Sequence, residues 1–193
     1  MRRRRAKTAE RYGVKGVFTR WQDLIEKARP SIVAITTPPN LHRDITLAAF
    51  ESGADVLCEK PLAMDRAQAE AMVAAAAQHK RVAMTCFNWR YPLAMQAMHE
   101  RLARGDVGRV LHVNARWYSA TFADEKAAAT WRMDSQQAGP GAMGDMGVHI
   151  IDLLRWNLGE GRAASAPRVG VAYPTALGAR GSAVRPIPTT IAR

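Results

Sequence analysis

Three short stretches of the 193-residue chain carry side chains that can exchange protons or bind a small polar molecule. They are Thr36-Thr-Pro-Pro-Asn-Leu-His42, Cys58-Glu-Lys-Pro61 and Gly144-Asp-Met-Gly-Val-His-Ile-Ile-Asp152. The first two stretches each follow a short apolar run that predicts a buried strand. Ligands bind outside the carboxyl ends of the strands in an open parallel sheet. We therefore expect these two stretches to line one cleft.

Lys60 is the candidate for proton transfer in the second stretch. Pro61 has a fixed φ and favours an extended backbone at Lys60, which directs the lysine over the edge of the sheet. There it could share a proton with a substrate hydroxyl. The alternative is an ordinary solvated lysine, because charged residues are common in surface loops.

The third stretch predicts a helix with a polar face and an apolar face. Asp145, His149 and Asp152 follow an i, i+4, i+7 spacing, which predicts one shared face directed into a cleft. His149 could act as a general base for a hydroxyl proton, and Asp145 could orient it or hold a neighbouring hydroxyl. The alternatives are a helix-start acid with a structural histidine, or a shared cation, for which clear third and fourth ligands are lacking. The aliphatic residues expected to pack on a core are Met146, Ile150, Leu153 and Leu154.

The elements that must position these residues follow from hydrophobic periodicity. From about residue 6 to residue 85 the pattern alternates between helical and strand-like runs, which predicts a parallel α/β sheet with right-handed crossovers. Asn40 is the expected N-cap of the helix that follows the first stretch. The expected strands are 16–19, 31–36, 55–58 and 81–85, and the expected helices are 6–12, 21–28, 41–52 and 65–79.

A second structural unit is expected after residue 86, because the pattern changes there. It predicts a helix over 92–104, a strand over 110–118, a loop over 119–142 and a helix over 144–158. From Gly159 onward Ala, Gly, Pro and Arg dominate without a period of 2 or 3.6, so we expect a poorly ordered tail over 159–193.

The three stretches resemble motifs of the Gfo/Idh/MocA family of NAD(P)-dependent sugar oxidoreductases, over roughly residues 6–158. The resemblance rests on the order and spacing of Thr-Pro-x-x-x-His at 37–42, Glu-Lys-Pro at 59–61 and Gly-x-x-x-Asp-x-Gly-x-His-x-x-Asp at 141–152. It implies an α/β fold: an incomplete Rossmann-like parallel sheet over 1–86, followed by the beginning of an α+β open-sheet substrate domain over 87–158. The first βαβ unit, with its Gly-x-Gly-x-x-Gly turn, is expected to be lacking from residues 1–86.

The resemblance also implies hydride transfer from a secondary alcohol carbon of a polyol or sugar to NAD or NADP. Lys60, Asp145 and His149 are the implied catalytic residues, and no catalytic metal is implied. Arg132 joins Asp145 and His149 as a candidate for substrate binding. The residues implied in dinucleotide binding are Thr37, Pro38, Asn40, His42, Glu59 and Lys60, with Asn88 and Arg90 toward the nicotinamide side or the substrate.

Without the glycine turn, a second hypothesis stays open. The chain could be a non-catalytic remnant that keeps the side chains, cannot hold the dinucleotide and is unstable or acts only through partners. The apolar face of the helix at 144–158 would then be partly uncovered, which invites association, so a homo-oligomer also stays open.

Composition narrows the class of partner. The net charge is +11, but the arginines at 2–5 and the excess after Gly159 supply eight of these charges. In the rest of the chain, positive and negative charges nearly balance, and no stripe of basic residues is visible. We therefore expect no nucleic-acid partner. Charges interrupt every window of about 20 residues, so no membrane partner is expected either. No apolar signal core follows the basic start, which predicts a cytoplasmic protein with reduced, buried thiols at Cys58 and Cys86.

Overall fold

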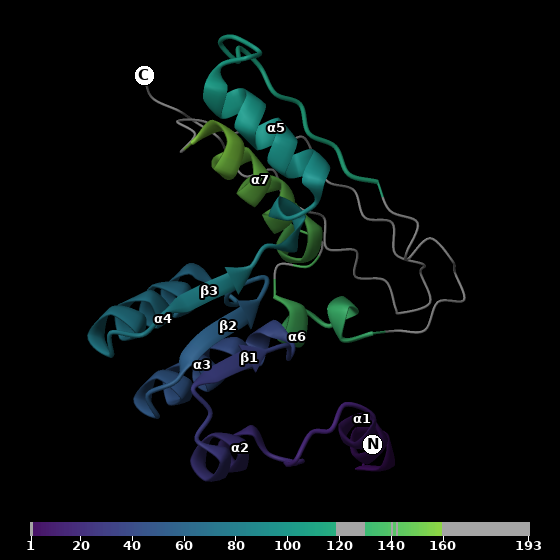
Figure 1. Cartoon of the computed structure of the whole chain (residues 1–193), viewed down its shortest axis with the longest axis vertical. Helices are drawn as coiled ribbons and strands as arrows, with labels where there is room; N and C mark the ends of the chain where they lie inside the picture. The colour runs from purple at the N-terminus through teal and green to yellow at the C-terminus, as the bar shows by residue number, and fades with distance from the viewer. Residues whose placement is uncertain (1, 119–129, 140, 142, 160–193) are drawn as a thin grey trace. The chain divides into compact units, whose positions relative to one another are not determined.

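The computed structural model describes residues 2–118, 130–139, 141 and 143–159, and the chain forms two compact units, 1–86 and 87–193 (Figure 1). No helix in these described ranges combines the length and apolarity needed to cross a bilayer.

The first unit is built on three parallel strands in the order β1–β2–β3 (Figure 1). In the register, Ile35 of β1 lies beside Cys58 of β2, and Glu59 of β2 lies beside Cys86 of β3. Parallel neighbours need long crossovers, and helices supply both of them. The strands are β1 (Ile32–Ile35), β2 (Asp55–Glu59) and β3 (Ala83–Cys86), and the helices are α1 (Arg2–Arg11), α2 (Trp21–Ala28), the 3-10 helix η1 (Pro39–Leu41), α3 (His42–Glu51) and α4 (Arg66–Gln78). The predicted α/β class is confirmed.

Local sequence signals explain where the crossover helices begin and end. The Asp65 carboxylate caps α4 by accepting a hydrogen bond of 2.8 Å from the Gln68 amide. After α3, Gly53 has a φ of +87°, a left-handed conformation that glycine adopts without the strain of a side chain. The predicted ends of these helices are confirmed to within about two residues.

The core of the first unit lies on one side of the sheet. Helix α3 packs on β2 and against α4, and Phe50, Ala49 and Ile35 are buried between them. The prediction of a buried strand at 31–36 is confirmed for Val33 and Ile35 and wrong for Ile32 and Ala34, which are exposed. Leu57 of β2 lies beside Ala34 and is exposed as well.

The predicted strand at 16–19 is also wrong. Residues 14–20 form bends and irregular backbone, and the Val17 side chain is exposed. A strand is stabilised by the ladder it shares with a neighbour, and the described strands all pair elsewhere. The β-like composition of residues 16–19 is therefore not sufficient to form a strand.

The second unit is helical in its described part (Figure 1). Helices α5 and α7 pack together, and the rings of His99 and Trp156 stack between them with centroids 4.1 Å apart. The elements are the 3-10 helices η2 (Asn88–Arg90) and η3 (Trp131–Met133), α5 (Leu93–Arg104), α6 (Ser135–Ala138), the π-helix η4 (Met143–Gly147) and α7 (Val148–Leu158).

Two predictions for the second unit need correction. Residues 110–118 form no strand, and Leu111 is 79% exposed, because no described segment of this unit offers a partner ladder. The predicted loop at 119–142 contains η3 and α6 in its described part, where Asp134 caps α6 through the Gln136 amide. Residues 119–129 and the predicted tail after Gly159 lie outside the described residues.

Candidate functional site

Two polar strand ends lie side by side in the first unit. Thr37 and Pro38 follow β1, Glu59 closes β2, and Lys60 comes next. The pairing of Ile35 with Cys58 in the last step of the ladder makes these ends neighbours. All four of these residues are half-buried, so they are partly open to a ligand.

Thr37 has an unusual environment at this edge. Its Oγ1 is buried and has no hydrogen-bond partner in the described protein. A buried hydroxyl without a partner is costly, and sites that bind polar ligands are one place where such a group occurs. The strand end therefore offers a hydroxyl that a bound dinucleotide could satisfy.

The loop after β1 departs from the predicted helix start. Asn40 is exposed and belongs to the 3-10 turn η1, while Leu41 occupies the N-cap of α3 without a side-chain hydrogen bond. The predicted N-cap role of Asn40 is thus wrong, because Pro39 begins a short turn of its own before α3 starts. His42, the first residue of α3, is completely buried.

Glu59 connects the end of β2 to its surroundings. Its carboxylate accepts a hydrogen bond of 3.2 Å from the Lys60 amide and also bonds the thiol of Cys86 on β3. The Lys60–Pro61 peptide is cis, and Pro61 is buried while Lys60 is half-buried. Lys60 is thus partly covered by protein, and its role in proton transfer stays a prediction.

The two cysteines are free but differ in exposure. Cys58 is buried, as predicted, whereas Cys86 at the end of β3 is only half-buried, so the prediction of two buried thiols is wrong for Cys86. Burial, with a smaller contribution from the Glu59 charge, raises the pKa of Cys58 to about 12. Burial, followed by the charge and hydrogen bond of Glu59, also raises the pKa of Cys86.

These thiols predict a pH dependence of reactivity and stability. At about pH 8 we expect a thiol reagent to label Cys86 slowly and Cys58 only after unfolding, since the thiolate is the reactive form. Because the folded pKa of Cys58 lies above the ordinary thiol pKa of 9.0, its contribution to stability is complete below about pH 9 and falls as pH rises toward 12. Mass spectrometry of labelled peptides with and without urea measures the difference. Equal labelling of both cysteines in the folded chain would contradict it.

In the second unit, His149 lies inside the protein. Its ring stacks on Trp89 with centroids 4.5 Å apart and meets the edge of Phe87 at 6.1 Å, and the residue is 5% exposed. Asp152 is also buried. The aliphatic residues Ile151 and Leu158 of α7 are exposed, and the others are half-buried. The prediction of a polar face that opens into a cleft is therefore wrong for His149 and Asp152, because aromatic and ionic partners bury both residues within the described unit.

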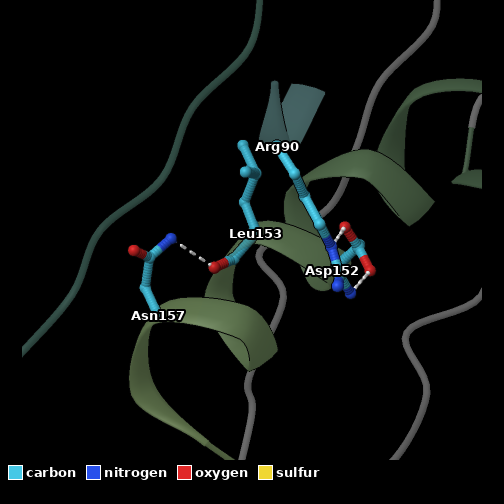
Figure 2. Close-up of polar contacts among 4 residues, drawn as sticks. All are labelled: Arg90, Asp152, Leu153 and Asn157. Carbon is cyan, nitrogen blue, oxygen red and sulfur yellow. Dashed lines mark hydrogen bonds and ion pairs between the residues drawn. The ribbon is translucent and has the colours of Figure 1, made fainter. Parts of the chain in front are cut away.

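Arg90 is the partner of Asp152 (Figure 2). Arg90 Nε donates to Asp152 Oδ2 at 2.8 Å, and Nη2 donates to Oδ1, so the guanidinium holds both carboxylate oxygens. The hydrogen bond to Asp152 is the largest cause that raises the pKa of Arg90. Asn88, the other residue of this predicted pair, is exposed at the start of η2.

Asp145 lies in a different helical geometry from His149. It belongs to the π-helix η4, whose i→i+5 turns change its angular position relative to α7, so the prediction of one α-helix over 144–158 is wrong. Asp145 pairs with Arg132 at 3.5 Å, and Arg132 lies over the Trp131 ring. In the described residues, no group of three acidic, histidine or cysteine side chains could hold a metal ion.

The glycine spacing of a dinucleotide turn occurs at Gly139, Gly141 and Gly144. It follows the helix α6 and leads into η4, whereas a dinucleotide turn follows a strand. This pattern therefore does not replace the glycine turn that residues 1–86 lack. Of the three predicted catalytic residues, Lys60 belongs to the first unit, and Asp145 and His149 belong to the second.

Comparison with known proteins identifies both units. Residues 1–87 match the protein family that is described as "Oxidoreductase family, NAD-binding Rossmann fold". Residues 95–171 match the family described as "GFO/IDH/MocA C-terminal domain". Levoglucosan dehydrogenase of Pseudarthrobacter phenanthrenivorans is 34% identical over 161 residues, which cover 83% of this chain and 41% of the relative.

Solved structures agree with these matches. An oxidoreductase domain protein from Kribbella flavida superimposes with a TM-score of 0.75 at 39% identity, covering 80% of this chain and 42% of that one. A levoglucosan dehydrogenase in complex with NADH and levoglucosan gives a TM-score of 0.72 at 32% identity, covering 82% and 43%. The chain thus spans less than half the length of these relatives.

The fold and the comparisons agree on the cofactor class. The first unit has the parallel strands and crossover helices of the matched NAD-binding domain, and NAD(P) is the cofactor of that domain. In the second unit, α7 lies within the segment 95–171 that matches the C-terminal domain. The chain belongs to the Gfo/Idh/MocA family of oxidoreductases.

Proposed function

We propose that this chain serves an NAD(P)-dependent oxidation of a secondary alcohol carbon in a sugar or cyclitol. The observation that carries the proposal is the pair of adjacent strand ends in the NAD-binding sheet, where Thr37 and Glu59 lie beside Lys60. Ligands bind at such ends in open parallel sheets. The relatives named above support a sugar or anhydrosugar as the substrate class.

The described residues fit a dinucleotide at this edge. The buried Thr37 Oγ1 lacks a partner and could bond a ribose or phosphate oxygen. Pro38 and the exposed Asn40 border the same loop, and Glu59 could accept from a ribose hydroxyl. In the second unit, Asn88 would contribute an exposed amide toward the nicotinamide side or the substrate, while Arg90 is committed to Asp152.

Three side chains, Lys60, His149 and Asp145, would handle the substrate hydroxyls and their protons. When bound, the nicotinamide accepts the hydride that leaves the alcohol carbon. The hydroxyl proton must leave at the same time, and Lys60 and His149 are the groups that could receive it. Asp145 would hold a neighbouring hydroxyl, and the Arg132 guanidinium at 3.5 Å keeps this carboxylate oriented. The Trp89 ring stacked on His149 restricts the imidazole to one plane.

Dinucleotide binding by the purified 193-residue chain tests the proposal. We expect NADH or NADPH to bind with a micromolar dissociation constant, read from nicotinamide fluorescence, because the strand ends are retained. Oxidation of levoglucosan, glucosides and inositols would then be followed by nicotinamide absorbance. Failure of a folded chain to bind either dinucleotide would reject catalysis by this chain and favour the non-catalytic hypothesis.

A further inference from the structure

The imidazole of His42 joins the two strand-end loops of the first unit. Its Nε2 lies 2.8 Å from the Thr37 carbonyl oxygen, and its Nδ1 lies 2.9 Å from the Pro61 carbonyl oxygen. One carbonyl belongs to the loop after β1 and the other to the loop after β2. A single side chain on α3 therefore contacts both loops that carry the candidate dinucleotide and proton-transfer residues.

This position keeps His42 away from any ligand in solution. The residue has 0% relative exposure and is among the largest completely buried side chains of the chain, together with Pro39 and Phe50. Every form of the ring carries at least one N–H, and both ring nitrogens lie within hydrogen-bond distance of a carbonyl. The ring thus faces backbone on both sides rather than the open edge of the sheet.

We propose that His42 is a positioning residue that sets the spacing between the Thr37–Pro38 loop and the Glu59–Pro61 loop, and that it does not contact the dinucleotide. The inference deepens the proposed function and rests on it only for the identity of the ligand. Pro38 follows one of the two carbonyls directly, and Lys60 precedes the residue that supplies the other. A change in either contact therefore reaches the residues that would meet the ligand.

Substitution with leucine or glutamine separates positioning from packing. His42→Leu fills much of the space but donates no hydrogen bond, whereas His42→Gln keeps an N–H donor that can reach one carbonyl. Thr46→Val is the matched control, because Thr46 is buried one turn further along α3 and its Oγ1 has no partner in the described residues. Its replacement removes a hydroxyl without breaking a contact between the loops.

Amide NMR spectra of the full chain without ligand give the primary result. We expect His42→Leu to shift the amide signals of Thr36, Thr37, Lys60 and Leu62, while those of β3 and the end of α4 stay in place. Thr46→Val should leave both loops unchanged. Unchanged loop signals in His42→Leu, changes spread evenly over the first unit, or equal loop shifts in Thr46→Val would each overturn the proposal.

The wild-type chain provides a measurement that does not depend on a variant folding. In ¹⁵N-histidine-labelled protein, a ring N–H of His42 should exchange with water far more slowly than that of His112, which is exposed. Exchange of the His42 ring proton as fast as that of His112 would overturn the inference.

The affinity for NADH is the second test of the role of His42. If wild type binds NADH, the loss of the imidazole contacts to the two loop carbonyls in His42→Leu should weaken binding about tenfold, with partial recovery in His42→Gln. Unchanged affinity in His42→Leu would overturn the positioning role. If wild type does not bind NADH, the proposed function fails, and the NMR and exchange results still decide the role of His42.

Discussion

Lys60→Met is expected to lower turnover of a sugar or cyclitol with NAD(P) by about 10²–10⁴-fold, the range for loss of a general acid–base group. Methionine keeps a similar length but cannot exchange a proton. Since Lys60 follows β2 at the open edge of the sheet and is half-buried, the loss should appear in kcat more than in KM. Initial rates of nicotinamide absorbance change, measured across substrate concentration, give both constants.

The control for Lys60→Met is Lys15→Met, which makes the same chemical change at an exposed position of the first unit. We expect Lys15→Met to retain the wild-type rate. A Lys60→Met enzyme that turns over at a rate similar to Lys15→Met would show that Lys60 takes no part in the chemistry. Binding of NADH measured in parallel distinguishes a chemical defect from loss of the dinucleotide.

Arg90→Leu is expected to destabilise the second unit by about 3 kcal/mol. Asp152 has a side-chain exposure of 8%, so removal of the guanidinium leaves a nearly buried carboxylate without its ionic partner. The cost is below that of a fully buried pair because the Arg90 side chain is 40% exposed, and water can reach part of the contact. Urea unfolding followed by tryptophan fluorescence measures it, since Trp89, Trp117, Trp131 and Trp156 all belong to this unit.

Two further variants test the cause of that loss. Arg104→Leu breaks a pair with Asp106 in which both side chains are exposed, so its expected cost is less than about 1 kcal/mol. The double variant Arg90→Leu/Asp152→Leu removes the stranded charge and should recover part of the stability lost in Arg90→Leu. If Arg90→Leu costs no more than Arg104→Leu, the Arg90–Asp152 pair does not stabilise the unit.

The sequence alone was sufficient for features that depend on near neighbours. The apolar runs at 31–36 and 55–58 and the helical periodicity at 65–79 each indicated their element, and the structure confirms these elements with ends shifted by about one residue. Gly53 and Gly105 follow the ends of α3 and α5, and both have positive φ. These signals are local because helix periodicity, capping and left-handed backbone involve residues only a few positions apart.

Features that depend on distant partners could not be obtained in this way. The segments at 16–19 and 110–118 have strand-like composition but form no strand, because a ladder needs a neighbouring strand as well as a suitable sequence. The burial of His149 and Asp152 on α7 was not predicted, since an amphipathic pattern distinguishes two faces and does not say which partners meet them. Trp89 and Arg90 decide that question for His149 and Asp152.

The sequence by itself thus determined the family motifs, the βα order of the first unit and the placement of Thr37, Glu59 and Lys60 after strands. Only the tertiary structure decided that His42 is buried between Thr37 and Pro61, and that Arg90 binds Asp152 across 62 positions of the chain. The physical reason is the range of the interactions. Hydrogen bonds and ion pairs between residues far apart in the sequence depend on how the helices and strands pack. The hydrophobic periodicity of the sequence does not determine the distances between such residues.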